Sequence, residues 1–224
     1  MAEIVFISEK NRARYLRIIA PVGDVFARMG VHPHVLSIAG FILSVVAGII
    51  FSTGSFFWAA WVVVLAGTCD ALDGQIARQT QKSSSFGAFF DSTLDRYSDM
   101  FFPIGLAYYY AGGVILSGFP SPGQGREASP WTVVIIILAI VGSFMVSYTR
   151  ARAEGLGLEC KKGMMQRPER ITLLVIGSLL GSIPKVGPVL LTITLLILAI
   201  SSNLTALFRV FFIRDQLLRN DQVK

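Results

Sequence analysis

The feature that most constrains the fold is a series of six long apolar stretches separated by short polar segments. They are residues 35–52, 58–69, 101–111, 131–148, 171–183 and 186–201. With adjoining residues, most of them reach the roughly 20 residues that a helix needs to cross a membrane. Only 15% of the residues are charged, against about 25% in soluble domains. The sequence therefore predicts an all-α integral membrane protein with six transmembrane helices.

An amphipathic segment precedes the first of these stretches. Between residues 9 and 30, apolar side chains recur at spacings of three and four, with charged residues between them. This pattern is typical of a helix that lies in the plane of the membrane interface. We therefore divide the chain into an N-terminal cytoplasmic segment with an interfacial helix (1–34), a six-helix domain (35–213) and a cytoplasmic tail (214–224).

The net charge of +6 could indicate a nucleic-acid partner, but the distribution of the basic residues favours a membrane topology. With a cytoplasmic N-terminus, eighteen of the twenty Lys and Arg residues fall on the cytoplasmic side, all except Arg126 and Lys185. This is the positive-inside rule. We expect a multi-pass protein of the cell (inner) membrane, with anionic lipid head groups and phosphorylated substrates, and no nucleic acid, as its partners.

Four carboxylates interrupt the apolar pattern near the predicted cytoplasmic surface. Asp70 and Asp73 are three residues apart, and Asp91 and Asp95 are four apart, so each pair shares one helix face. If the two helices form an antiparallel hairpin, all four side chains enter one pocket, where hard oxygen ligands suit Mg²⁺, Mn²⁺ or Ca²⁺. The alternative is that they merely pair with nearby arginines. Asp99, four residues after Asp95, could either extend the pocket or pair with an arginine. Four carboxylates at this depth favour a functional site.

Small residues lie on the same helix faces as the carboxylates. Gly74, Ala77 and Gly87 remove bulk there, so that a phosphate or a neighbouring helix can approach closely. Arg78 adds a forked donor suited to phosphate oxygens. The combination predicts a site for metal ions and a pyrophosphate.

The order of these residues resembles the signature of the CDP-alcohol phosphotransferase family at all eight of its positions. The matching residues are Asp70, Asp73, Gly74, Ala77, Arg78, Gly87, Asp91 and Asp95. The resemblance implies an enzyme that uses two divalent cations, Mg²⁺ or Mn²⁺, to bind the pyrophosphate of a CDP-linked lipid such as CDP-diacylglycerol. It also implies a homodimer.

The family resemblance assigns a role to each matching residue. Asp70, Asp73, Asp91 and Asp95 would hold the metal ions, and Asp95 would also deprotonate the acceptor hydroxyl while CMP leaves. The CDP site would be lined by Asp73, Gly74, Ala77, Arg78 and Gly87. The chemistry is sound, because cations draw charge from the phosphates and a carboxylate can accept the proton of a weak nucleophile.

A second motif concerns the acceptor alcohol. Residues 147–170 are similar to the "SY-x-K-AR-AE…RPER" pattern of the phosphatidylinositol phosphate synthases, which use inositol 1-phosphate. By this resemblance, the phosphate of the acceptor would be held by Ser147, Arg150, Arg152, Arg170 and Arg209. Arg150 departs from the pattern, which usually has Lys there, and its longer, forked side chain could change the shape of the pocket.

Other functions remain open from the sequence. Glycerol 3-phosphate would also need an arginine cluster and would give phosphatidylglycerophosphate, whereas uncharged inositol or serine would need fewer cations. The arginines could instead belong to a loop that binds lipid head groups. From another class, a cation transporter could carry acidic residues, but transporter sites tend to lie at broken helices near the bilayer centre. A scaffold that retains the motif without catalysis is a further alternative.

Overall fold

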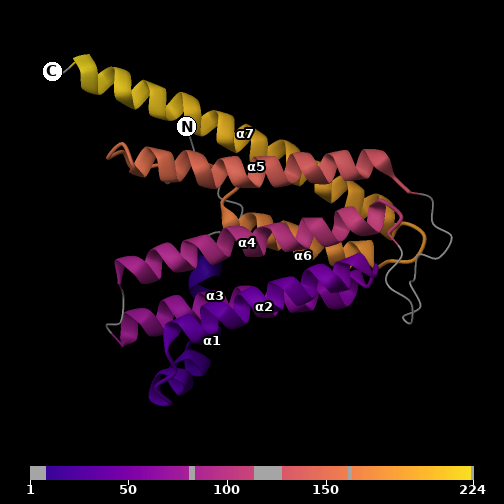
Figure 1. Ribbon diagram of the computed structural model, residues 1–224, viewed down its shortest axis with the longest axis horizontal. Helices are drawn as coiled ribbons and strands as arrows, with labels where there is room; N and C mark the ends of the chain where they lie inside the picture. Colours follow the sequence, from indigo (N-terminus) through magenta and orange to yellow (C-terminus); the bar gives the residue numbers. More distant parts are fainter. Residues whose placement is uncertain (1–8, 81–83, 114–127, 161–162, 223–224) are drawn as a thin grey trace.

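The protein is entirely helical over the residues that the computed structural model describes, which are 9–80, 84–113, 128–160 and 163–222. Figure 1 shows the seven helices of these ranges: α1 (Glu9–Arg28), α2 (Pro33–Ser52), α3 (Phe56–Gln79), α4 (Ser85–Tyr110), α5 (Pro130–Glu154), α6 (Arg167–Gly181) and α7 (Gly187–Gln222). This confirms the all-α prediction. Parts of the N-terminal segment (1–8) and of the tail (223–224), and Arg126, lie outside the described residues.

Each of the helices α2 to α7 overlaps one of the six predicted apolar stretches, although α3, α4 and α7 extend well beyond theirs. Four of them, α2, α3, α5 and α7, are long and apolar enough to cross a membrane. The helix α4 carries Asp91, Asp95 and Asp99, and α6 has only 15 residues. Neither is among the four helices that qualify as membrane spans, so six crossings stay a prediction. The helix α7 continues through residues 214–222, so the described part of the predicted tail extends the last helix.

The N-terminal helix α1 packs against α3. The hydroxyls of Tyr15 and Thr68 are 2.6 Å apart, and the Gln75 side chain donates a hydrogen bond of 3.3 Å to the carbonyl of Ala20. These contacts fix α1 beside the half of α3 that carries the aspartates. Its predicted place in the membrane interface is not tested by them.

The helix α2 lies between α3 and α4 and packs tightly against both. A Cβ atom on Gly48 would lie 2.6 Å from the carbonyl oxygen of Phe101, and one on Gly40 would lie 3.2 Å from that of Ala66. Such small residues let helix backbones approach closely. Among the described residues, the backbones of α3 and α4 do not pack on each other. The two helices that carry the aspartates are therefore held side by side through α2 and not by direct contact of their backbones.

The second half of the bundle consists of α5, α6 and α7. Figure 1 shows α5 running alongside α7, and α6 packs on α7. Contacts of α3 with α6 and of α4 with α5 join the two halves around one apolar core, which includes the fully buried Phe51, Leu106, Ile136 and Leu191. This packing brings the first residues of α6 to the carboxylates of α3 and α4.

Candidate active site

The start of α4 is fixed by a side-chain cap. Ser84 has an extended backbone, and its hydroxyl accepts a hydrogen bond of 3.0 Å from the backbone N–H of Gly87. A serine in this position satisfies one of the free N–H groups at a helix start. The helix then continues without interruption through Asp91 and Asp95, which confirms that these two side chains share one helix face.

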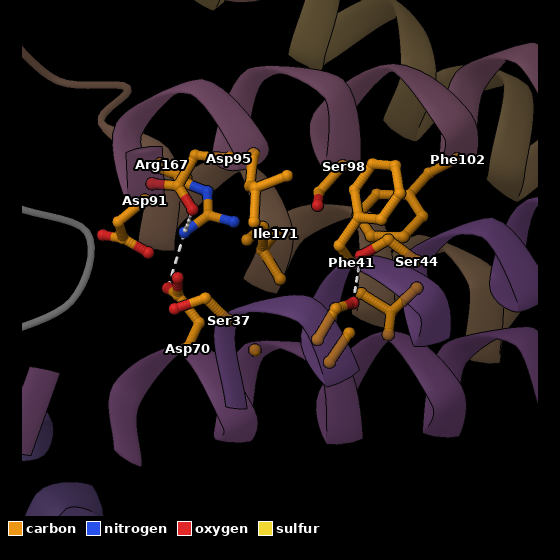
Figure 2. A pocket seen from close by; sticks show the side chains of 15 residues that line it. Ser37, Phe41, Ser44, Asp70, Asp91, Asp95, Ser98, Phe102, Arg167 and Ile171 are labelled. Atoms are coloured by element: carbon orange, nitrogen blue, oxygen red, sulfur yellow. Dashed lines mark hydrogen bonds and ion pairs between the residues drawn. The ribbon is translucent and has the colours of Figure 1, made fainter. Parts of the chain in front are cut away.

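Three carboxylates meet across the space between α3 and α4. Asp70, Asp91 and Asp95 each offer an oxygen atom, and the three oxygens lie within 4.8 Å of one another. They line one end of a cavity that continues between the helices past Ser98 and Phe102 (Figure 2). Three carboxylate oxygens are a donor set that fits a hard divalent cation.

The fourth predicted ligand, Asp73, has a different partner. It is only 4% exposed, and one of its carboxylate oxygens accepts a hydrogen bond of 2.6 Å from the hydroxyl of Ser37 on α2. Asp73 is not part of the group of three carboxylates. Its role as a metal ligand stays a prediction, and Ser37 is a neighbour that the sequence did not indicate.

The guanidinium of Arg167 lies among the carboxylates. Its Nη1 atom is 2.5 Å from Asp70 and 2.9 Å from Asp95, and its Nε atom is 3.2 Å from Asp99. Figure 2 shows this side chain between Asp95 and Asp70. One guanidinium therefore forms ion pairs with three carboxylates from two other helices.

Asp99 connects the carboxylates with a second arginine. One of its oxygens contacts Arg167, and the other accepts a hydrogen bond of 3.0 Å from the Nη2 atom of Arg170. Arg170 is 5% exposed and also donates to the backbone carbonyl of Met165. Of the two roles that the sequence left open for Asp99, the pairing with arginine is the one seen here.

The residues assigned to the CDP site lie along α3 and at the start of α4. A Cβ atom on Gly74 would lie 3.5 Å from the Nη1 atom of Arg78, so the guanidinium folds back over this glycine. Ala77 is half-buried beside it. A Cβ atom on Gly87 would lie 3.1 Å from the imidazole of His34. The sequence gave His34 no part in this site.

Three of the arginines assigned to the acceptor phosphate gather between α5, α6 and α7. Arg209 is 2% exposed, and its Nη1 atom donates a hydrogen bond of 2.5 Å to the carbonyl of Val146. Val146 lies one turn before Arg150 on α5. Arg170 donates to the carbonyl of Met165, whose backbone N–H donates to Thr205, one turn before Arg209 on α7. Arg150 also forms an ion pair of 2.8 Å with Glu154.

The two other residues of the acceptor assignment lie at the edge of this cluster. Ser147 donates a hydrogen bond to the carbonyl of Ser143, and it lines a small cavity between α4 and α5 that also reaches Asp99. Arg152 is exposed. The structure therefore buries Arg170 and Arg209, whereas Arg150 and Arg152 are both exposed.

Comparison of the sequence with the patterns of known protein families shows the family to which this chain belongs. The pattern described as CDP-alcohol phosphatidyltransferase matches residues 30–215, which include both the carboxylates and the arginine cluster. The chain belongs to this family. Membership confirms the resemblance found in the signature residues and the assignment to an enzyme class, and it disfavours a transporter.

Relatives of known name support a narrower comparison. The chain is 33% identical over 206 residues to phosphatidylinositol phosphate synthase of Mycolicibacterium smegmatis, covering 91% of this chain and 87% of that protein. It is 32% identical over 203 residues to archaetidylinositol phosphate synthase of Methanothermobacter thermautotrophicus, covering 90% and 91%.

Solved structures agree with these relatives. Phosphatidylinositol phosphate synthase of Mycobacterium tuberculosis with CDP-DAG bound matches with a TM-score of 0.75 and 31% identity, over 88% of this chain and 94% of that one. The same enzyme in complex with manganese and citrate matches with a TM-score of 0.72 and 30% identity, over 86% and 87%. The fold of this chain is therefore shared with a protein that is known with a CDP-lipid and with a divalent metal.

Proposed function

We propose that this protein transfers the phosphatidyl group of CDP-diacylglycerol, or a related CDP-lipid, to a hydroxyl of inositol 1-phosphate. The products are a phosphatidylinositol phosphate and CMP. The observation that carries this proposal is that the carboxylates of Asp70, Asp91 and Asp95 converge beside a buried arginine cluster. Relatives named phosphatidylinositol phosphate synthase support the choice of acceptor.

Divalent cations fit the carboxylate end of the site. Asp70, Asp91 and Asp95 would hold them, with Asp73 as a further ligand, and Mg²⁺ or Mn²⁺ suits this donor set. When bound, two such ions would draw negative charge from the pyrophosphate of the lipid. A related structure contains manganese, which supports a divalent metal in this family.

The chain itself supplies the remaining parts of the CDP site. Gly74, Ala77 and Gly87 leave room for the cytidine diphosphate beside the carboxylates, and the forked guanidinium of Arg78 can donate two hydrogen bonds to phosphate oxygens. Arg78 folds back over Gly74, where a Cβ atom would make only ordinary van der Waals contact with its guanidinium.

Asp95 is the proposed base. Its carboxylate accepts the proton of the acceptor hydroxyl as that oxygen attacks the phosphorus atom next to the diacylglycerol. The new phosphodiester bond forms while the bond to the CMP phosphate breaks, and CMP leaves with the electron pair. No covalent intermediate with the protein is needed.

The arginine cluster is proposed to bind the phosphate of the acceptor, through Ser147, Arg150, Arg152, Arg170 and Arg209. A loop that only contacts lipid head groups would expose its arginines, yet Arg170 and Arg209 are almost fully buried. Burying a guanidinium is costly unless it has partners, and these include Asp99 for Arg170 and the carbonyl of Val146 for Arg209. A phosphate between these side chains would add several charge-assisted hydrogen bonds.

The placement in the membrane follows from this chemistry. We propose that α2 to α7 cross the inner membrane, that α1 lies in its cytoplasmic interface, and that the site opens to the cytoplasm and to the inner leaflet. The CDP-lipid then enters sideways from the bilayer, and the phosphorylated alcohol arrives from water. The family resemblance also implies a homodimer, which we include in the proposal.

The test is product identification with the purified protein. Vesicles or micelles containing CDP-diacylglycerol and Mg²⁺ are incubated in separate reactions with inositol 1-phosphate, glycerol 3-phosphate, inositol or serine, and CMP and lipid products are measured by mass spectrometry. We expect CMP and phosphatidylinositol phosphate with inositol 1-phosphate, and no product after chelation of the metal. Consumption of glycerol 3-phosphate alone would overturn the acceptor, and absence of CMP in every reaction would overturn the reaction class.

A further inference from the structure

Arg167 forms ion pairs with carboxylates on two other helices. It is the first residue of α6, and it forms ion pairs with Asp70 on α3 and with Asp95 and Asp99 on α4. One guanidinium therefore connects three helices through three acidic side chains. Its side chain is 23% exposed, so these ion pairs are only partly screened by water.

Two of these ion pairs involve the proposed metal ligands. Asp70 and Asp95 belong to the group of three carboxylates that fits a divalent cation, and the Nη1 atom of Arg167 is within 2.9 Å of both. A guanidinium and a divalent cation carry charges of the same sign, and at a few ångströms these repel each other strongly. Arg167 and a metal ion therefore compete for the same two carboxylates.

The third ion pair involves a carboxylate outside the proposed metal site. Asp99 is not part of the group of three, and its second oxygen is held by the buried Arg170. A guanidinium that leaves Asp70 and Asp95 can therefore keep its Nε contact with Asp99. This matters because a buried guanidinium without any partner would be costly.

We propose that Arg167 is an internal counter-cation of the carboxylate site. In the metal-free protein it neutralises Asp70 and Asp95, divalent cations bind by displacing it from these two residues, and Asp99 retains it afterwards. Arg167 thereby lowers the affinity for the metal while it prevents repulsion among the carboxylates when the metal is absent. This inference rests on the metal site of the proposed function.

The test is the affinity of the substrate-free protein for Mn²⁺, measured from the signal of free Mn²⁺ in electron paramagnetic resonance. We expect Arg167→Met to bind Mn²⁺ about tenfold more tightly than the unchanged protein, or more, because a competing cation is removed. General damage to the site would weaken binding instead, so the direction of the change identifies the role. The matched control is Arg214→Met, which removes an exposed arginine paired with Asp215 at the far end of α7 and should leave the affinity unchanged.

Two further variants keep every outcome interpretable. Arg167→Lys retains the charge but cannot bridge several carboxylates at once, so it should bind Mn²⁺ with an intermediate affinity, and it decides the matter if Arg167→Met does not fold. Unchanged or weaker binding in the folded Arg167 variants would overturn the counter-cation. In contrast, failure of the unchanged protein to bind Mn²⁺, or binding that Asp91→Asn does not weaken, would overturn the metal site of the proposed function itself.

Discussion

The carboxylate site and the arginine cluster are neighbours, but they are built in opposite ways. The three carboxylates come from residues 70–95, on two helices that follow each other in the chain, and they line an open cavity. The arginines come from α5, α6 and α7, and two of them are buried. A site with regular local spacing can be found in a sequence, whereas a site assembled from distant helices depends on the fold.

The two regions are connected through a single side chain. Asp99 holds Arg167 with one oxygen and Arg170 with the other, so the metal end and the acceptor end share a partner. Substitutions at the carboxylates should therefore affect the reaction rate, and substitutions at the arginines should affect the KM of the acceptor. A substitution of Asp99 should affect both the metal and the acceptor.

The largest effect is expected at the carboxylate end. Asp91→Asn should lower the rate of CMP release from CDP-diacylglycerol by about a thousandfold or more, because the metal ions contribute several kcal/mol to the transition state. The affinity for inositol 1-phosphate should change little. The exposed Asp215→Asn serves as the control, and a rate within tenfold of the unchanged protein would contradict the role of Asp91.

A different pattern is expected at the arginine end. Arg209→Gln should raise the KM for inositol 1-phosphate by about a hundredfold, because a charged donor to the phosphate is lost. The KM for CDP-diacylglycerol should stay the same, because the proposed CDP site lies on α3 and α4, whereas Arg209 on α7 contacts Val146 on α5. Steady-state kinetics with each substrate varied in turn would separate the two values. An equal rise in both would indicate damage to the fold.

A smaller effect, on both the acceptor and the metal, is expected from Asp99, the residue that connects the two ends. Asp99→Asn keeps the shape of the side chain but removes the charge that holds Arg167 and Arg170. The KM for inositol 1-phosphate should rise by about tenfold. Binding of Mn²⁺ should weaken, because Arg167 then has fewer alternatives to Asp70 and Asp95. A rise in the KM for inositol 1-phosphate with no change in Mn²⁺ affinity would show that Asp99 does not connect the two regions.

The smallest effect is expected at Ser37. Ser37→Ala removes the hydrogen bond of 2.6 Å to Asp73, and the net contribution of one such bond corresponds to about two- to tenfold. We expect a decrease of this size in kcat/KM for CDP-diacylglycerol. Ser44 on the same helix donates to the backbone carbonyl of Gly40, so Ser44→Ala is a suitable control. A loss as large as that of Asp91→Asn would show that the position of Asp73 depends wholly on Ser37.

The spacing of the aspartates was sufficient to predict much of the carboxylate site. Asp91 and Asp95 lie on one face of an uninterrupted helix, and Asp70 reaches them from α3. The sequence did not reveal that α2 separates the two helices, because that depends on the close approach that Gly40 and Gly48 permit.

The side chains that contact the aspartates, Arg167 and Ser37, could not be predicted from the sequence. Arg167 lies 97 positions from Asp70 in the chain, and no local pattern relates residues at such a distance. The motif around Arg167 drew attention to the acceptor phosphate, although its guanidinium contacts the carboxylates. Likewise, the hydrogen bond from Ser37 to Asp73 depends on the packing of α2 on α3, because the two residues are 36 positions apart in the chain.

The central claim is that carboxylates from α3 and α4 jointly hold a divalent metal needed for the transfer reaction. It is tested most directly by a crystal of the protein with Mn²⁺, using anomalous scattering from the metal. The account predicts a peak among Asp70, Asp91 and Asp95, with Arg167 no longer in contact with Asp70 and Asp95. A peak elsewhere, or none at these residues, would contradict it.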